Sequence, residues 1–436
     1  MIAAPGEMLI ASDPVDTARG GVLRWLLVTY VVLLPVQIDT PFNIRFAPSD
    51  LCLVVALCLG LRVWRVRWPA WNGWHVALLG LFALSVLTGF LATGSVSQYV
   101  LLNKTAGIVL LFGSYLALTS LADSWGDWRW FLKAFLLSVT VQNVVNSAAF
   151  LWWRISGVGV DDPWLDILLS GGFDRLAGML IDANAYGGLL VVAYAIVLLD
   201  DNSPRPLFGW RMRLFSLATL SLGLLLTSSR SAGLGFAVLT MVGAARNPRL
   251  LFAVLVCVVV GVAATAYLAG PEEFDALFTV STRQNTIDER VEISENALRM
   301  FARYPLMGGG IGAFVEEHDI IVHNTALWFL AEFGLVGALI LIGFLGSFLA
   351  SAWAAYHRVG PDRRPLIVGL VAAHLAMIGF SLGVEALYQR WWWFVMALLA
   401  SAHTLALEGS EPISDTTNNG AHAASEADLQ PAGVNQ

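Results

Sequence analysis

The chain has 436 residues, of which 57% are hydrophobic and only 13% are charged, and its formal net charge is −7. Soluble globular proteins carry about 25% charged residues, so this composition excludes a soluble enzyme, and no basic patch indicates nucleic-acid binding. Apolar runs of about 20 residues recur along the chain, each long enough to cross a bilayer. The sequence therefore predicts an all-α polytopic integral membrane protein.

The negative charge lies in the two ends of the chain. Residues 1–20 sum to −2 and residues 408–436 to −5, which leaves residues 21–407 neutral. The end segments are polar or small in composition, which is typical of solvated chain without a packed core. We predict an N-terminal tail over 1–20, a membrane domain over 21–407 and a disordered acidic tail over 408–436.

Twelve apolar runs within the membrane domain are predicted to span the bilayer. In chain order they are 21–38, 47–63, 74–93, 101–122, 131–153, 183–200, 214–228, 231–245, 250–269, 323–353, 366–386 and 391–407. With the N-terminus inside, fifteen of the 25 Lys and Arg residues fall in cytoplasmic segments and six in short loops outside. The excess of basic residues inside favours this orientation, with both termini in the cytoplasm.

Two connections on the outer face are much longer than the others, at residues 154–182 and 270–322. Connections of this length are usually functional or disordered. In the second, TIDERVEISENALRMFARYP has helical periodicity. Its predicted apolar face comprises Ile287, Val291, Leu298 and Phe301, and its polar face includes Glu295 and Arg299 at i,i+4 spacing. We expect an amphipathic helix on the membrane surface, followed by a flexible glycine hinge over 308–312.

Polar residues gather at three separate points on the predicted outer face. First, Arg175 precedes a helix start at which Asp182 or Asn184 is a plausible N-cap. Second, Ser229 and Arg230 form a tight turn between two spans. Third, His323 and Asn324 stand at the start of a long span. Taken singly, each point has an ordinary explanation as a lipid-interface anchor, a helix cap or a packing residue. Glu332, which lies inside a span, is equally consistent with an interhelical hydrogen bond.

Taken together, the three points suit a diphosphate and a base. Guanidinium groups bind phosphate oxygens in pairs and keep their proton, and a helix N-terminus adds partial positive charge. Histidine accepts a proton at neutral pH. The sequence contains no Asp-x-Asp, Cys-x-x-Cys or His-Glu-x-x-His pattern, so we predict neither a metal site nor a cofactor.

These residues resemble the O-antigen ligase and O-antigen polymerase superfamily of bacterial membrane glycosyltransferases. The resemblance runs over residues 170–345 and rests on five motifs in family order. They are Arg175-x-x-Gly178 with Asn184, then Ser229-Arg230, then Arg290 in the long loop, then Pro305 with Gly308, Gly310 and Gly312, and then His323-Asn324 with Glu332 and Gly334.

The resemblance implies a GT-C-like enzyme of the bacterial inner membrane with its active site facing the periplasm. The implied donor is a glycan on undecaprenyl diphosphate, and the implied acceptor is a glycan or lipid A–core. Arg175, Arg230 and Arg290 would bind the diphosphate, and His323 would orient or deprotonate the acceptor. Asn184, Ser229, Asn324 and Glu332 would support them, and a chain-length regulator is a possible protein partner.

Three functions remain open at this stage. We favour a polymerase that joins exopolysaccharide repeat units, with inversion and without a metal, and the alternative within the family is a ligase that attaches polysaccharide to lipid A–core. A polysaccharide transporter or lipid flippase is the alternative from another class. Transporters tend to carry midplane carboxylates and internal repeats, whereas here the informative residues cluster at one face and we find no repeat.

Overall fold

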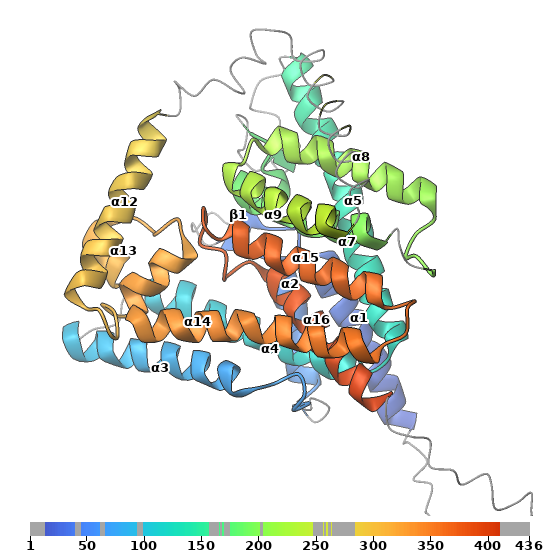
Figure 1. Cartoon of the computed structure of the whole chain (residues 1–436), viewed down its shortest axis with the longest axis horizontal. Coiled ribbons are helices and arrows are strands. Elements are labelled where there is room, and N and C mark those ends of the chain that lie inside the picture. Colours follow the sequence, from blue (N-terminus) through green and yellow to red (C-terminus); the bar gives the residue numbers. More distant parts are fainter. Residues whose placement is uncertain are drawn as a thin grey trace, which may run out of the picture.

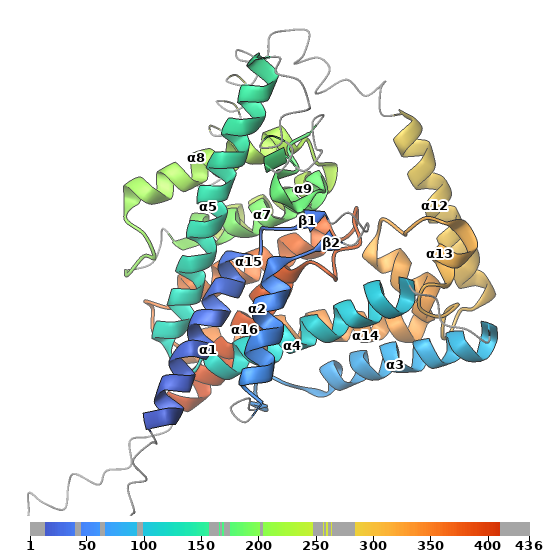
Figure 2. The ribbon, with the colours of Figure 1, turned by 180° about the vertical axis from the view of Figure 1, so that it is seen from behind.

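The computed structural model describes residues 14–39, 45–61, 66–93, 99–156, 175–200, 204–246 and 284–409, together with positions 165, 168, 169, 256, 259 and 263. Within these residues the chain is an all-α membrane protein apart from one antiparallel pair of two-residue strands, β1 (Ile38–Asp39) and β2 (Arg45–Phe46). Figures 1 and 2 show the helices from opposite sides.

Within the described residues, the N-terminal half contains five helices and one π-helical turn. They are α1 (Pro14–Val32), α2 (Pro48–Leu59), α3 (Gly73–Thr93), the turn η1 (Tyr99–Thr105), α4 (Ala106–Leu121) and α5 (Trp125–Ser156). Helix α1 packs against α2 and α5, and α3 runs beside α14 (Thr325–Arg358) in both views (Figures 1 and 2).

The C-terminal half supplies the helices that position the candidate site. They are the short 3₁₀ turn η2 (Gly178–Leu180), then α7 (Ala183–Leu199), α8 (Trp210–Thr227), α9 (Arg230–Arg246), α12 (Gln284–Arg303), α13 (Ala313–His318), α14, α15 (Arg364–Phe380) and α16 (Arg390–Glu408). Helix α7 is buried along nearly its whole length, because α8, α9 and α15 all pack against it. An apolar helix covered on every side is typical of the centre of a membrane bundle.

Eleven of the twelve expected spans coincide with described helices, and the twelfth, 250–269, lies almost wholly outside the described residues. Three of the described helices are long and apolar enough to cross a membrane, namely Asn103–Leu121, Trp125–Ser156 and Thr325–Arg358. Six other apolar helices are shorter. The number of crossings therefore stays a prediction.

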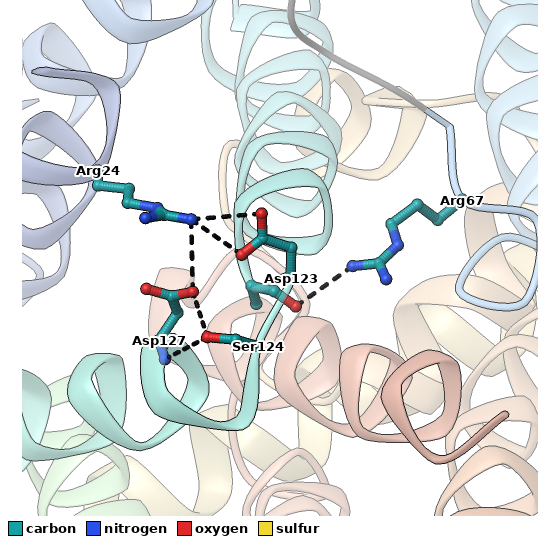
Figure 3. A network of polar contacts seen from close by, with 6 residues as sticks. Arg24, Arg67, Asp123, Ser124 and Asp127 are labelled. Carbon is teal, nitrogen blue, oxygen red and sulfur yellow. Dashed lines mark hydrogen bonds and ion pairs between the residues drawn. The ribbon is translucent and has the colours of Figure 1, made fainter. Parts of the chain in front are cut away.

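The described ends of the chain lie at the same end of the bundle, where α1 begins and α16 stops (Figures 1 and 2). Charged residues connect the helices there (Figure 3): Arg24 donates to Asp123 at 3.0 Å and lies 3.6 Å from Asp127. Arg67 donates to the carbonyl oxygen of Ala122 at 3.3 Å and pairs with Glu408. Exposed ion pairs contribute little stability individually, so this network mainly fixes how the helix ends meet.

The long connection at 270–322 contains the expected helix, α12, with the expected Glu295–Arg299 pair at 3.6 Å. Val291 and Leu298 of the predicted apolar face are exposed on the protein, while Ile293, Ala297 and Met300 are buried, so the helix packs on the protein through a different set of residues. Contact of the exposed face with the membrane surface stays a prediction. The helix has a second apolar stripe, and the small side chain of Ala297 lets that stripe approach α14 closely. Helix α12 crosses the N-terminal end of α14 instead of running along it (Figure 1).

The segment expected to be a glycine hinge is hydrogen-bonded to α14 in the structure. Residues 308–312 form a turn held by backbone hydrogen bonds to α14, which is interrupted at Gly334 (φ 65°, ψ −161°). Gly308 and Gly334 allow the backbones of the turn and of α14 to approach closely.

Candidate functional site

Two of the three predicted polar points meet in one hydrogen-bonded junction. The Nε atom of Arg175 donates to the carbonyl oxygen of Thr227 at 2.9 Å, and its terminal nitrogen donates to Oδ1 of Asn184 at 3.0 Å. The hydroxyl of Ser229 donates to the same Asn184 oxygen at 2.8 Å. Asn184 therefore joins the segment that carries Arg175 to the turn before α9, although Asn184 and Ser229 lie 45 residues apart.

Local backbone geometry explains how the junction forms. Asp182 caps α7, and its Oδ1 accepts from the backbone N–H of Asn184 at 2.8 Å, which confirms the predicted N-cap. Ser228, in the left-handed region (φ 47°), reverses the chain between α8 and α9. The N–H of Leu176 donates to the carbonyl oxygen of Leu226 at 3.0 Å and holds the segment that carries Arg175 against the end of α8.

Arg230 is the first residue of α9 and is exposed beside this junction. Among the described residues, no hydrogen bond or ion pair engages its guanidinium group. The hydroxyl of Ser229 accepts from the N–H of Ala232 at 3.2 Å and so caps the first turn of α9. Helices α7 and α9 both begin here, so two partly positive helix ends and two guanidinium groups occupy one region. Such a region favours a multiply charged anion.

His323 and Asn324 stand at the start of α14. Oδ1 of Asn324 accepts from the N–H of Leu327 at 3.0 Å and caps the helix, while its Nδ2 donates to the carbonyl oxygen of Leu382 at 2.9 Å. The hydroxyl of Thr325 accepts from the N–H of Ala386 at 2.8 Å. The start of α14 is therefore tied to the segment between α15 and α16, and His323 has a fixed place.

Charges from three other parts of the chain act on the His323 ring. Burial, and next the nearby Arg290, lower the pKa of His323 below its ordinary value of 6.5, while Asp182, Glu289 and Glu385 oppose the shift. Asp182 at the start of α7 and Arg290 on α12 thus both contribute to the electrostatic environment of His323. At neutral pH the ring is therefore uncharged and able to accept a proton.

The predicted supporting residue Glu332 makes its hydrogen bonds away from the junction. It is buried, and its Oε2 accepts from the N–H of Gly312 at 2.9 Å and from Nε1 of Trp328 at 2.6 Å. Its carboxylate thus holds the glycine turn on α14 instead of facing the junction.

A buried ion pair between Lys104 and Glu385 was not anticipated from the sequence. Their side chains are 6% and 9% exposed, and the ammonium group lies 4.5 Å from the Trp328 ring centroid and 4.9 Å from that of Tyr388. In the orientation predicted above, Lys104 is one of the six basic residues in short loops outside. An available signal was that each charge stands alone in an apolar run, since charges inside a membrane protein generally pair.

No group of three or more His, Cys, Asp or Glu side chains suited to a metal occurs in the part of the chain that the structure describes. The cationic groups around the junction are arginines and helix N-termini. They suit an anionic ligand and not a cation.

Comparison with known proteins adds one finding. No curated protein matches the chain. A family model described as O-antigen ligase matches residues 215–342, from α8 into α14. The matched segment contains Ser229, Arg230, Arg290, His323 and Glu332, while Arg175 and Asn184 lie upstream and join it through the junction. This match supports the resemblance of the chain to the O-antigen ligase and polymerase superfamily.

Proposed function

We propose that the chain is a glycosyltransferase of the bacterial inner membrane that transfers a glycan from undecaprenyl diphosphate to an acceptor sugar at the periplasmic face. The observation that carries the proposal is the meeting of Arg175, Asn184 and Ser229 beside Arg230, with His323 under the electrostatic influence of Asp182 and Arg290. This arrangement supports a site in which arginines bind the diphosphate and His323 acts as the base.

The proposed step is a single displacement. An acceptor hydroxyl oxygen forms a bond to the anomeric carbon while the bond from that carbon to the diphosphate oxygen breaks, which inverts the configuration. The hydroxyl proton passes to His323, and the bonding electrons leave with the lipid diphosphate. Arg175, Arg230 and Arg290 stabilise the negative charge that grows on the leaving group.

We favour repeat-unit polymerisation, while the match to a family described as O-antigen ligase favours the ligase alternative. Purified protein given lipid-linked single repeat units should produce a ladder of longer lipid-linked glycans. A product formed only when lipid A–core is added would instead identify a ligase. If neither mixture consumes the donor, the proposed function is wrong.

The first prediction concerns the side of the membrane on which the site lies. In a variant without native cysteines, Glu316→Cys on α13 should react with an impermeant maleimide in cells with a permeabilised outer membrane, and Asp362→Cys should not. The side chains at both positions are at least partly exposed. The glycines within 308–312 are not used as cysteine positions, because Gly308, Gly310 and Gly312 have positive φ, which a cysteine side chain rarely adopts. Labelling of Asp362→Cys alone would place the site in the cytoplasm.

The second prediction concerns pH. Protonation of His323 removes the base, so turnover should be constant near neutral pH and fall only below the ordinary histidine value of 6.5. Arg290→Gln removes a neighbouring positive charge that lowers the pKa of His323, so the acid limb should move to higher pH. Arg299→Gln, on the exposed face of the same helix, is the control and should leave the limb in place. An acid limb that Arg290→Gln leaves unmoved would contradict this electrostatic assignment.

The third prediction concerns metal ions. Guanidinium groups and helix N-termini supply the positive charge that a divalent ion supplies in other diphosphate enzymes. Turnover with purified donor should therefore be unchanged in excess EDTA. Loss of turnover on chelation and its return with Mg²⁺ or Mn²⁺ would show that a metal takes part.

A further inference from the structure

The turn that follows α12 lies directly on the interrupted part of α14. The N–H groups of Gly309 and Gly310 donate to the carbonyl oxygens of Ala331 and Glu332, both at 2.9 Å. In return, the N–H groups of Leu335 and Val336 donate to the carbonyl oxygens of Pro305 and Leu306 at 2.9 and 3.1 Å. We name this arrangement, residues 305–312 on residues 331–336, the glycine clasp.

Two glycines make this close approach possible. A Cβ atom on Gly308 would lie 2.2 Å from the backbone of Glu332 and Phe333, and one on Gly334 would lie 2.5 Å from the backbone of Leu306. Gly334 also adopts φ 65° and ψ −161°, a region that side chains essentially exclude. The interruption of α14 exposes the backbone groups that the turn then pairs.

The Glu332 side chain on α14 adds side-chain hydrogen bonds to the clasp. One carboxylate oxygen accepts from Trp328 on the same helix and from the N–H of Gly312 at the end of the turn. The N–H of the preceding residue, Ile311, donates to the Ser85 hydroxyl of α3 at 2.7 Å. Both contacts are buried, and a buried N–H left without a partner is costly.

The clasp lies between two segments, α12 with Arg290 and the start of α14 with His323. We call these two segments the limbs. On one side, Met300 of α12 packs against Gly309, and Arg303 pairs with Glu317 of α13 at 2.6 Å. On the other side, α14 runs back from the clasp to His323. The clasp therefore joins the end of α12 to α14, so a shift of the turn relative to α14 breaks its hydrogen bonds.

We propose that the glycine clasp sets the separation between Arg290 and His323, and that Glu332 is a positioning residue for the transfer reaction. This inference rests on the proposed function, in which Arg290 binds the leaving diphosphate and His323 takes the acceptor proton. A displacement of about 1 Å at reacting groups is enough to lower a rate by about 100-fold.

The test compares three variants in a background without native cysteines. Glu332→Ala removes the acceptor, Glu332→Gln keeps an oxygen for both N–H groups, and Gly346→Ala is the control in α14, where an added Cβ meets nothing within 4 Å. Spin labels at Leu298 on α12 and Ala326 on α14, both exposed, report the separation of the limbs. Turnover and donor binding are measured on the same proteins.

We expect Glu332→Ala to broaden the distance distribution and to lower kcat by about 10- to 100-fold. Donor binding should change little, because Arg175 and Arg230 lie outside the clasp. Glu332→Gln should keep a narrow distribution and stay within about fivefold of the parent, because a neutral hydrogen bond replaces a charged one. Gly346→Ala should match the parent in every measurement.

A narrow distribution together with full turnover in Glu332→Ala would overturn the inference, and so would a broadened distribution with unchanged kcat. If the parent protein transfers no glycan, the proposed function fails for all variants alike. The distance measurement still decides whether the clasp holds the two limbs together.

Discussion

His323→Ala should lower turnover by about 10²–10⁴-fold, the usual effect of removing a general base, while donor binding stays near the parent value. The reason is the division of roles: the ring is neutral at pH 7 because its burial and Arg290 lower its pKa, whereas the arginines that bind the donor remain. Single-turnover kinetics and an equilibrium binding assay with lipid-linked donor separate the two effects.

His318→Ala is the matched control for this experiment. His318 lies five positions earlier in the same loop, is half-buried, and packs on the Phe314 ring with centroids 4.7 Å apart. It should keep turnover close to that of the parent. Full turnover in folded His323→Ala would mean that His323 is only a residue at the start of α14, and equal losses in both variants would point to a damaged loop.

The two junction arginines should respond differently to replacement by lysine. Arg230 is exposed and unengaged among the described residues, so Arg230→Lys should weaken donor binding by about 10- to 100-fold, since an ammonium group cannot reproduce two parallel hydrogen bonds. Its thermal stability should be unchanged. Calorimetric unfolding and donor titration measure the two quantities.

Arg175→Lys should lose both donor affinity and stability. The guanidinium group holds the Thr227 carbonyl and Asn184 together, so its loss should destabilise the junction by about 1–3 kcal/mol and lower Tm. Arg299→Lys, exposed on α12, is the control for both variants. Normal donor binding by both Arg175→Lys and Arg230→Lys would assign these arginines to lipid anchoring or to the fold.

The match between expected and observed helices has a local cause. The apolar runs at Ala183–Leu199 and Arg230–Arg246 predict helices regardless of their packing partners. In an apolar setting the backbone groups of such a segment must form hydrogen bonds within the segment itself. The same holds for the cap at Asp182, which needs only its own turn. The order of the family motifs was likewise a property of the sequence alone.

The face of α12 could not be chosen in this way. The helix carries one apolar stripe through Val291 and Leu298 and another through Ile293, Ala297 and Met300, and periodicity does not say which stripe meets the protein. Contact with α14 and Gly309 selects the stripe that includes a small residue, because the two elements approach closely there.

The sequence by itself determined an all-α membrane protein with polar residues at three points, because hydrophobic length, charge and helix caps act over a few neighbouring residues. Only the tertiary structure decided that Arg175, Asn184 and Ser229 share one junction, that Lys104 pairs with Glu385, and that the glycines fasten a loop to a broken helix. Each of these depends on partners up to 281 positions apart. Their meeting is set by how whole helices pack, which no local pattern specifies.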